Sequence, residues 1–147
     1  MEKINVEKMT ISDLEKIKQN LQTDFDEFWT PTILESELNN TNSLYFVAKY
    51  NENILGFAGI IINYDFTEIS NIVVKKDFRN KGIGKILLEK IINESKKLKK
   101  DNIYLEVNEK NEIALGLYEK YNFEKVGKRK EYYNKKDDAI LMSLKIL

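Results

Sequence analysis

A glycine-containing basic turn is the part of the sequence whose residue types and spacing most directly indicate chemistry. It runs Arg79-Asn80-Lys81-Gly82-Ile83-Gly84 and leads into an amphipathic segment that begins at Lys85. Where a turn opens a helix, free backbone N–H groups and the positive end of the helix dipole meet. Glycines let the main chain approach a ligand because no Cβ stands in the way, and Arg79 and Lys81 add full charges. The turn is therefore predicted to hold a phosphate or pyrophosphate.

Two familiar phosphate loops do not match this turn. A Walker A loop requires Gly-x-x-x-x-Gly-Lys-Ser/Thr, but Ile86 follows Gly84-Lys85, and Arg79 stands where the first glycine is needed. A dinucleotide-binding loop requires a third glycine, and that position is Leu87. What remains is the pattern Arg/Gln-x-x-Gly-x-Gly/Ala after a strand, for which an ordinary strand–helix turn is the alternative interpretation.

Apolar periodicity predicts the elements that position the turn. A strand over residues 68–74 precedes it, and apolar residues at helical spacing continue it as a helix to residue 98. The mostly apolar strand at 103–107 is expected inside the sheet, followed by a helix over 113–121. The other expected elements are an edge strand at 3–9, helices capped by Ser12-Asp13 and begun by Thr30-Pro31, a hairpin of 44–50 and 54–63, and strands at 123–132 and 140–146.

The order of motifs from the turn onward resembles a known family. The Arg/Gln-x-x-Gly-x-Gly/Ala pattern resembles the acyl-CoA loop of the GNAT-type N-acetyltransferases. The later motifs are similar to those of the RimI-type ribosomal-protein-alanine N-acetyltransferases. They are Leu105-Glu106-Val107, Asn111, Ala114, Leu117-Tyr118, Asn122-Phe123, the run Arg129-Lys130-Glu131-Tyr132-Tyr133 and the run from Asp137 to Met142. The resemblance covers about residues 68 to 144 well, and the first 65 residues match only in layout.

This resemblance implies a fold and a cosubstrate. The fold would be a single GNAT α/β domain over residues 1–147, with a mixed, mostly antiparallel sheet that is splayed at its centre and flanked by helices. The cosubstrate would be acetyl-CoA, without a metal. The implied cofactor-binding residues are Ile72, Val73, Val74, Arg79, Asn80, Lys81, Gly82, Ile83, Gly84, Lys85, Asn111 and Tyr118. Asn111 would contact the pantetheine arm; a helix N-cap is its alternative role, and one residue can do both.

Acetyl transfer requires a neutral amine, a polarised thioester carbonyl and a proton for the leaving thiolate. The chain contains no histidine, so the base must be a carboxylate, a tyrosine or water. Glu106 lies in mid-strand, where an acidic residue is costly unless it faces a cleft or has a partner; solvent exposure or pairing with a lysine is the alternative. The resemblance implies that Glu106 is the general base, acting through water, and that the Tyr118 hydroxyl near the CoA sulfur is the acid. Core packing is the alternative for Tyr118.

Aromatic pairs are the candidates for the acceptor side. Phe28-Trp29 stands where the group usually has Pro-Trp, and Tyr132-Tyr133 could line a peptide groove; packing is the alternative for both pairs. The expected activity is acetylation of a protein N-terminus, namely the N-terminal alanine of a small-subunit ribosomal protein. One rival is an acetyltransferase of a small amine, polyamine or lysine side chain. Another is a catalytically silent acyl-CoA sensor, against which the retention of Glu106 and Tyr118 argues.

Composition excludes several other classes of function. Lys+Arg 24 balance Asp+Glu 24 among 147 residues, so direct binding to nucleic acid is not expected. Without cysteine or histidine, the chain has no disulfide, no thiolate nucleophile and no cysteine or histidine zinc site. Residues 1–8 contain no apolar h-region, so a leader peptide is not expected. No apolar run approaches 18 residues, so membrane insertion is not expected. We therefore expect a cytoplasmic protein, as a monomer or weak dimer.

Overall fold

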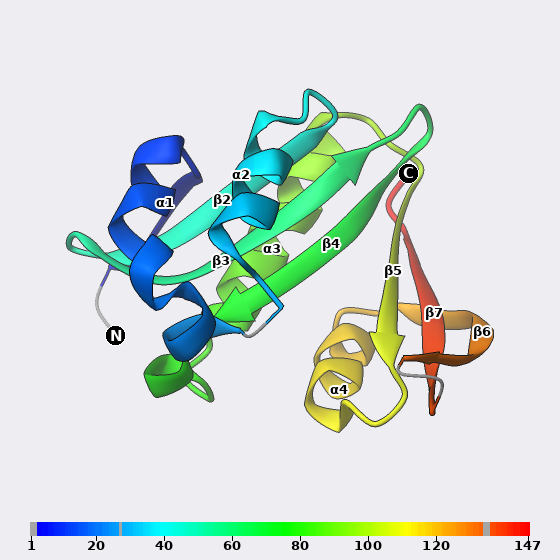
Figure 1. Ribbon diagram of the computed structural model, residues 1–147. Helices are drawn as coiled ribbons and strands as arrows, with labels where there is room; N and C mark the ends of the chain where they lie inside the picture. The colour runs from blue at the N-terminus through cyan, green and yellow to red at the C-terminus, as the bar shows by residue number, and fades with distance from the viewer. Residues whose placement is uncertain (1–2, 27, 134–135) are drawn as a thin grey trace.

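The computed structural model describes residues 3–26, 28–133 and 136–147, and its seven strands form one sheet (Figure 1). The strand order is β1-β2-β3-β4-β5-β7-β6, and every pairing is antiparallel except that of β4 with β5. The strands are β1 (Asn5–Lys8), β2 (Ser43–Tyr50), β3 (Asn53–Ile62), β4 (Phe66–Val74), β5 (Asn102–Asn108), β6 (Glu124–Tyr133) and β7 (Asp137–Lys145). The expected mixed, mostly antiparallel sheet with an interior β5 is confirmed.

The sheet splays between its two parallel strands. Pairing of β4 with β5 covers only Phe66–Glu68 opposite Asn102–Tyr104, after which the two strands diverge, as Figure 1 shows. In the part of the chain that the structure describes, no strand pairs with this edge of β4 beyond Glu68. Backbone N–H and C=O groups along such an edge can bind a ligand instead of a neighbouring strand.

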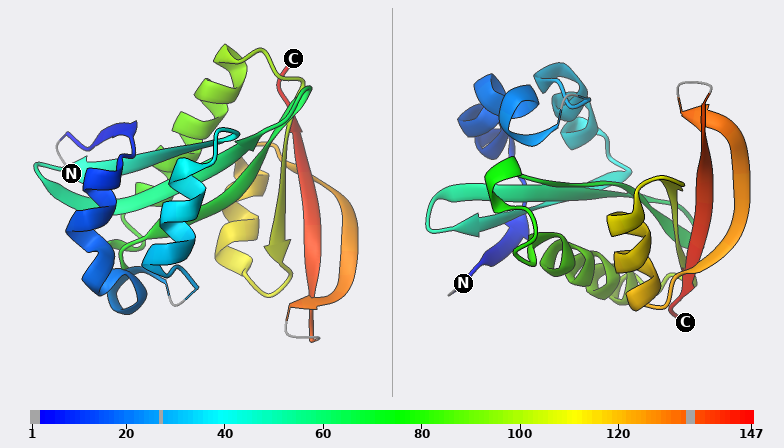
Figure 2. Two further views of the ribbon diagram at one scale, coloured as in Figure 1. Left: turned by 45° about the horizontal axis from the view of Figure 1, so that its top comes forward. Right: turned by 90° about the horizontal axis from the view of Figure 1, so that it is seen from below.

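Helices cover both faces of the sheet (Figure 2). On one face lie α1 (Ile11–Ile17), a 3₁₀ turn (Lys18–Asn20), a π-helical turn (Leu21–Phe25) and α2 (Pro31–Asn39). On the other lie α3 (Ile83–Lys97) and α4 (Glu112–Lys120), and the short 3₁₀ turn Lys76–Phe78 leads from the end of β4 toward α3. Each face buries its own apolar cluster, one including Leu87 and Ile91 of α3, the other Leu21 and Leu34. Among the described residues, no helix is long and apolar enough to span a membrane.

The helix starts show which local signals operate. The Thr30-Pro31 start of α2 is confirmed: the Thr30 hydroxyl accepts a hydrogen bond from the backbone N–H of Ile33 at 3.1 Å. The predicted Ser12-Asp13 cap is wrong, because Thr10 is the N-cap of α1. The Thr10 hydroxyl accepts from the N–H of Asp13, whose carboxylate accepts from the N–H of Thr10 at 2.9 Å. This reciprocal capping box satisfies two orphan donors, which a cap two residues later would leave unpaired.

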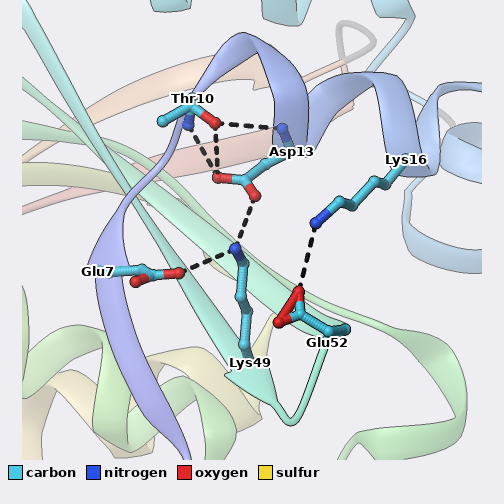
Figure 3. A network of polar contacts seen from close by, with 6 residues as sticks. All are labelled: Glu7, Thr10, Asp13, Lys16, Lys49 and Glu52. Carbon is cyan, nitrogen blue, oxygen red and sulfur yellow. Dashed lines mark hydrogen bonds and ion pairs between the residues drawn. The ribbon is translucent and has the colours of Figure 1, made fainter.

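The same carboxylate anchors α1 to the edge of the sheet (Figure 3). Lys49 of β2 lies 2.8 Å from Asp13 and 2.8 Å from Glu7 of β1. The side chains of Lys49 and Asp13 are only 13% and 4% exposed. Burial by itself would raise the pKa of Asp13, but the hydrogen bond to Lys49 and those from Thr10 outweigh it and lower the pKa below its usual value.

Replacing Asp13 with asparagine is expected to lower the free energy of unfolding by about 2–3 kcal/mol at pH 7, because it leaves Lys49 buried with one anionic partner fewer. The lowered folded pKa makes this contribution fully present above the ordinary value of about 3.9 and lost as the pH falls through the folded value. Urea unfolding should therefore show a difference that shrinks from pH 7 toward pH 2. Glu15→Gln, which breaks an exposed pair with Lys18, should cost less than about 0.5 kcal/mol; equal losses would contradict the assignment.

Candidate active site

The predicted phosphate turn borders a cleft of about 530 Å³, called here the cofactor cleft. The open edge of β4, the start of α3 and one side of α4 form its walls. Its described lining residues are Asp26, Ile72, Val73, Val74, Phe78, Arg79, Asn80, Gly82, Ile83, Gly84, Lys85, Asn111, Ile113, Ala114, Leu117 and Tyr118. Of the residues predicted to bind the cofactor, Lys81 is not among those lining the cleft. The structure therefore brings together lining residues that are up to 92 positions apart in sequence, from Asp26 to Tyr118.

Backbone conformation makes the turn suitable for an anion. Gly82 is the N-cap of α3 with φ +86°, a left-handed conformation that favours glycine, and Asn80 has φ +62°. A Cβ built on Gly82 would meet no atom within 4 Å, so the space before it is open. The helical bonding begins with Ile86 N–H donating to the Gly82 carbonyl at 3.1 Å. The preceding N–H groups have no helical acceptor and lie at the positive end of the helix dipole.

Replacing Gly82 with valine is expected to weaken acetyl-CoA binding by about 10-fold or more, because a branched side chain would intrude on the phosphate and strain the left-handed backbone. Isothermal titration calorimetry measures the affinity. Gly84→Ala is the matched control, since its Cβ would lie 3.9 Å from Leu117 and Val74, an ordinary contact. Unchanged affinity in the valine variant would exclude this placement of the phosphate.

The two charged side chains of the turn are engaged within the protein. Arg79 donates from Nη2 to the Phe25 carbonyl at 2.7 Å and from Nε to the Val74 carbonyl at 3.1 Å. The Lys81 ammonium lies 5.5 Å from the centre of the Phe78 ring. Arg79 thus connects the turn to Phe25. The main-chain N–H groups are therefore the chief donors that the turn has for an anion.

A second cleft, of about 750 Å³, opens between the diverging strands β4 and β5 and is called here the acceptor cleft. Its described lining residues are Phe28, Ile61, Glu68, Ile69, Ser70, Asn71, Ile72, Leu105, Glu106, Val107, Asn108, Asn111, Ala114, Tyr118 and Tyr132. Four of these, Ile72, Asn111, Ala114 and Tyr118, also line the cofactor cleft. The two clefts therefore share a wall, which is where a group could pass from one ligand to another.

Tyr118 and Asn111 form most of the polar part of this shared wall. Tyr118 is 8% exposed, and its ring packs at a steep angle to Phe123 with centroids 5.6 Å apart. Asn111 is the N-cap of α4, where its side-chain oxygen accepts from the N–H of Ala114 at 3.1 Å. The capping role of Asn111 is thus present together with a position on both clefts.

Glu106 faces the acceptor cleft and also has an ionic partner. Its side chain is 20% exposed, and its Oε1 lies 3.1 Å from Nε of Arg129. Glu106 thus has an ionic partner, as one alternative from the sequence proposed, but the partner is an arginine and not a lysine. Neither Arg129 nor Glu68, a second carboxylate on this cleft, carries a local sequence signal that marks it as part of the site. Both would be found only by knowing which strands are neighbours.

The aromatic residues predicted to contact the acceptor differ in their exposure. Phe28 and Tyr132 are 62% and 53% exposed and line the acceptor cleft. Trp29 is 3% exposed, is not among the described residues of either cleft, and packs edge-on against Phe28, Tyr45 and Phe57. Core packing, the alternative for Trp29, is the role that this placement supports. The side chain of Tyr133 lies outside the described part of the chain. Within that part, no cluster of three or more acidic side chains could hold a metal ion.

Known proteins are similar to this chain in sequence and in fold. Residues 14–123 match the model of the Acetyltransferase (GNAT) family. The chain is 34% identical over 106 residues to the ribosomal protein bS18-alanine N-acetyltransferase of Escherichia coli (strain K12), covering 70% of this chain and 72% of that protein. The crystal structure of the ribosomal-protein-S18-alanine N-acetyltransferase from Escherichia coli has a TM-score of 0.88 and 28% identity, covering 98% of this chain and 94% of that one.

A ligand-bound structure is also similar. A GNAT family acetyltransferase from Elizabethkingia anophelis with acetyl-CoA bound has a TM-score of 0.78 and 25% identity, covering 99% of this chain and 100% of that one. The family match spans well over half of the sequence and includes the predicted phosphate turn, β4, β5 and all four residues of the shared wall. The expected fold is confirmed, and the chain belongs to the GNAT family of acetyltransferases.

Proposed function

We propose that this N-acetyltransferase transfers the acetyl group of acetyl-CoA to the α-amine of a protein N-terminus, and specifically to the N-terminal alanine of a small-subunit ribosomal protein. The observation that carries the proposal is the wall shared by two open clefts, one bordered by the predicted phosphate turn and the other lined by aromatic and acidic side chains. The Escherichia coli relative named above acts on the alanine of ribosomal protein bS18.

In this mechanism the two proton-transfer groups, Glu106 and Tyr118, both line the acceptor cleft. Glu106, through a water, first takes a proton from the acceptor ammonium, and the neutral nitrogen then bonds to the acetyl carbon. One backbone N–H group of β4, among residues 72–74, donates to the carbonyl oxygen as negative charge develops there. The carbon–sulfur bond then breaks, and the Tyr118 hydroxyl supplies a proton to the leaving thiolate. The proton that the nitrogen loses as the amide forms passes through water to restore the hydroxyl. The described geometry suits this division because Glu106 and Tyr118 line one cleft from different elements.

Acceptor choice follows from basicity and from the shape of the cleft. An α-amine has a pKa of about 8, against about 10.4 for lysine, so a carboxylate relay can deprotonate it more readily. Phe28 and Tyr132 are more than half exposed at the rim, which suits a flexible peptide. Glu68 and Glu106 make the cleft acidic, so a basic second residue should be favoured; each charge or cation–π contact is worth about 0.5–2 kcal/mol when partly desolvated.

A competition experiment tests this proposal. The enzyme is incubated with acetyl-CoA and three acceptors: a peptide starting Ala-Arg, the same peptide with a blocked N-terminus and a free lysine, and a polyamine. We expect the α-amine of the first peptide to be acetylated far faster than either rival, with products identified by mass spectrometry. A peptide starting Ala-Glu is the matched control for the acidic cleft and should react more slowly. Faster lysine or polyamine acetylation would assign the chain to the side-chain or small-amine enzymes.

A further inference from the structure

Arg129 of β6 connects two residues of the acceptor cleft without being among its described lining residues. Its Nε lies 3.1 Å from Oε1 of Glu106, and its guanidinium carbon lies 5.5 Å from the centre of the Tyr132 ring. Both neighbours line the cleft. A guanidinium combines an ion pair at its edge with stacking on its face, and lysine cannot reproduce this geometry.

Sheet order allows this contact across a whole intervening strand. Arg129 pairs with Ala139 of β7, and Glu106 pairs with Leu141 of the same strand, two residues away. Residues two apart on a strand share a face, so both side chains rise from one face of the sheet on either side of β7. Two strand spacings are about 10 Å, which an arginine and a glutamate can bridge together. The short Ala139 side chain leaves this path open.

A bulge brings Tyr132 to the same place. Residues three apart on a regular strand point to opposite faces, which would separate Tyr132 from Arg129. Between Arg129 and Tyr133 the pairing with β7 shifts, and Glu131 takes a left-handed φ of +50°. The N–H of Glu131 donates to Oδ1 of Asp138 at 2.7 Å, which holds the bulge. The bulge therefore returns Tyr132 to the face that carries Arg129.

We propose that Arg129 is a positioning residue that holds Oε1 of Glu106, so that the second carboxylate oxygen is presented to the acceptor amine or its relay water. A carboxylate has two acceptor oxygens, and fixing one limits the rotamers of the other. The proposal rests on the role of Glu106 in the proposed function. It predicts that loss of Arg129 lowers kcat and leaves the KM for acetyl-CoA unchanged, because the cofactor cleft does not contain Arg129.

A double-mutant cycle tests this coupling. Arg129→Met keeps much of the aliphatic length and removes the charge, and is expected to lower kcat by about 10-fold in the unaltered enzyme. In the Glu106→Gln background the same change should alter kcat by less than about 2-fold, because there is no carboxylate left to position. Arg129→Lys should recover part of the lost rate. Lys128→Met is the matched control: Lys128 is the preceding residue on β6 and pairs with Asp138, and its loss should leave kcat unchanged.

The cycle is run on whichever acceptor of the competition panel the unaltered enzyme turns over, so its outcome is separate from the identity of that acceptor. Thermal melting of each variant shows whether it is folded, and Arg129→Lys replaces Arg129→Met if the latter is not. An equal loss of kcat in both backgrounds, or wild-type kcat in Arg129→Met, would overturn the positioning role. A loss of kcat in the enzyme that retains Glu106, but not in the Glu106→Gln background, supports the positioning role if the KM for acetyl-CoA is unchanged.

Discussion

Replacing Tyr118 with phenylalanine is expected to lower kcat by about 10²- to 10⁴-fold, the usual range for loss of a general acid. The ring itself is 8% exposed and packs on Phe123, and phenylalanine preserves that packing. Affinity for acetyl-CoA should therefore change little. Steady-state kinetics with calorimetry on the same samples separates the two quantities.

Tyr121 supplies the matched control for this experiment. It lies nearly one turn further along α4, and its hydroxyl donates to Glu89 of α3 at 2.6 Å, outside both clefts. Burial and the hydrogen bond to Glu89 raise the pKa of Tyr121 to about 12. Tyr121→Phe should cost about 1 kcal/mol of stability and leave kcat within about 2-fold of wild type. If both variants retain wild-type turnover, water protonates the thiolate and the assignment of Tyr118 is wrong.

Replacing Glu106 with glutamine is expected to lower the acetylation rate most strongly at low pH. An α-amine with a pKa of about 8 loses its neutral form roughly tenfold for each pH unit below that value. The unaltered enzyme deprotonates bound ammonium at Glu106, whereas the variant depends on amine that is already neutral. The wild-type rate divided by the variant rate should therefore increase as the pH is lowered from 9 to 6, with both rates measured as kcat/KM for the Ala-Arg peptide.

Glu68→Gln separates proton transfer from the general charge of the cleft. Glu68 lines the same cleft from β4 but is assigned no proton. Its loss should raise KM for a peptide with a basic second residue and leave the shape of the pH profile unchanged. If Glu68→Gln and Glu106→Gln give the same profile, the carboxylates act only as cleft charge, and Glu106 is not the base.

Much of the cofactor side could be predicted because its signals are local. The turn, its left-handed Gly82 and the helix after it depend on residues a few positions apart, and the Asn111 cap depends on the residue three positions later. The α1 cap shows the limit of such signals: Ser12 and Thr10 are both acceptable caps by type, and the reciprocal bond with Asp13 decides between them.

Local sequence predicts a glycine-containing basic turn between a strand and a helix, because backbone conformation and helix polarity are set by neighbouring residues. Packing between distant segments, by contrast, buries Trp29 while Phe28 is exposed on the cleft, and brings Arg129 rather than a lysine to Glu106. Adjacent aromatic residues are alike in sequence and differ only in what packs on them. Arg129 and Glu106 meet because β6 and β5 pair with opposite edges of β7, in registers that place the two residues near each other. The order of strands in a sheet depends on the packing of the whole chain and cannot be read from neighbouring residues.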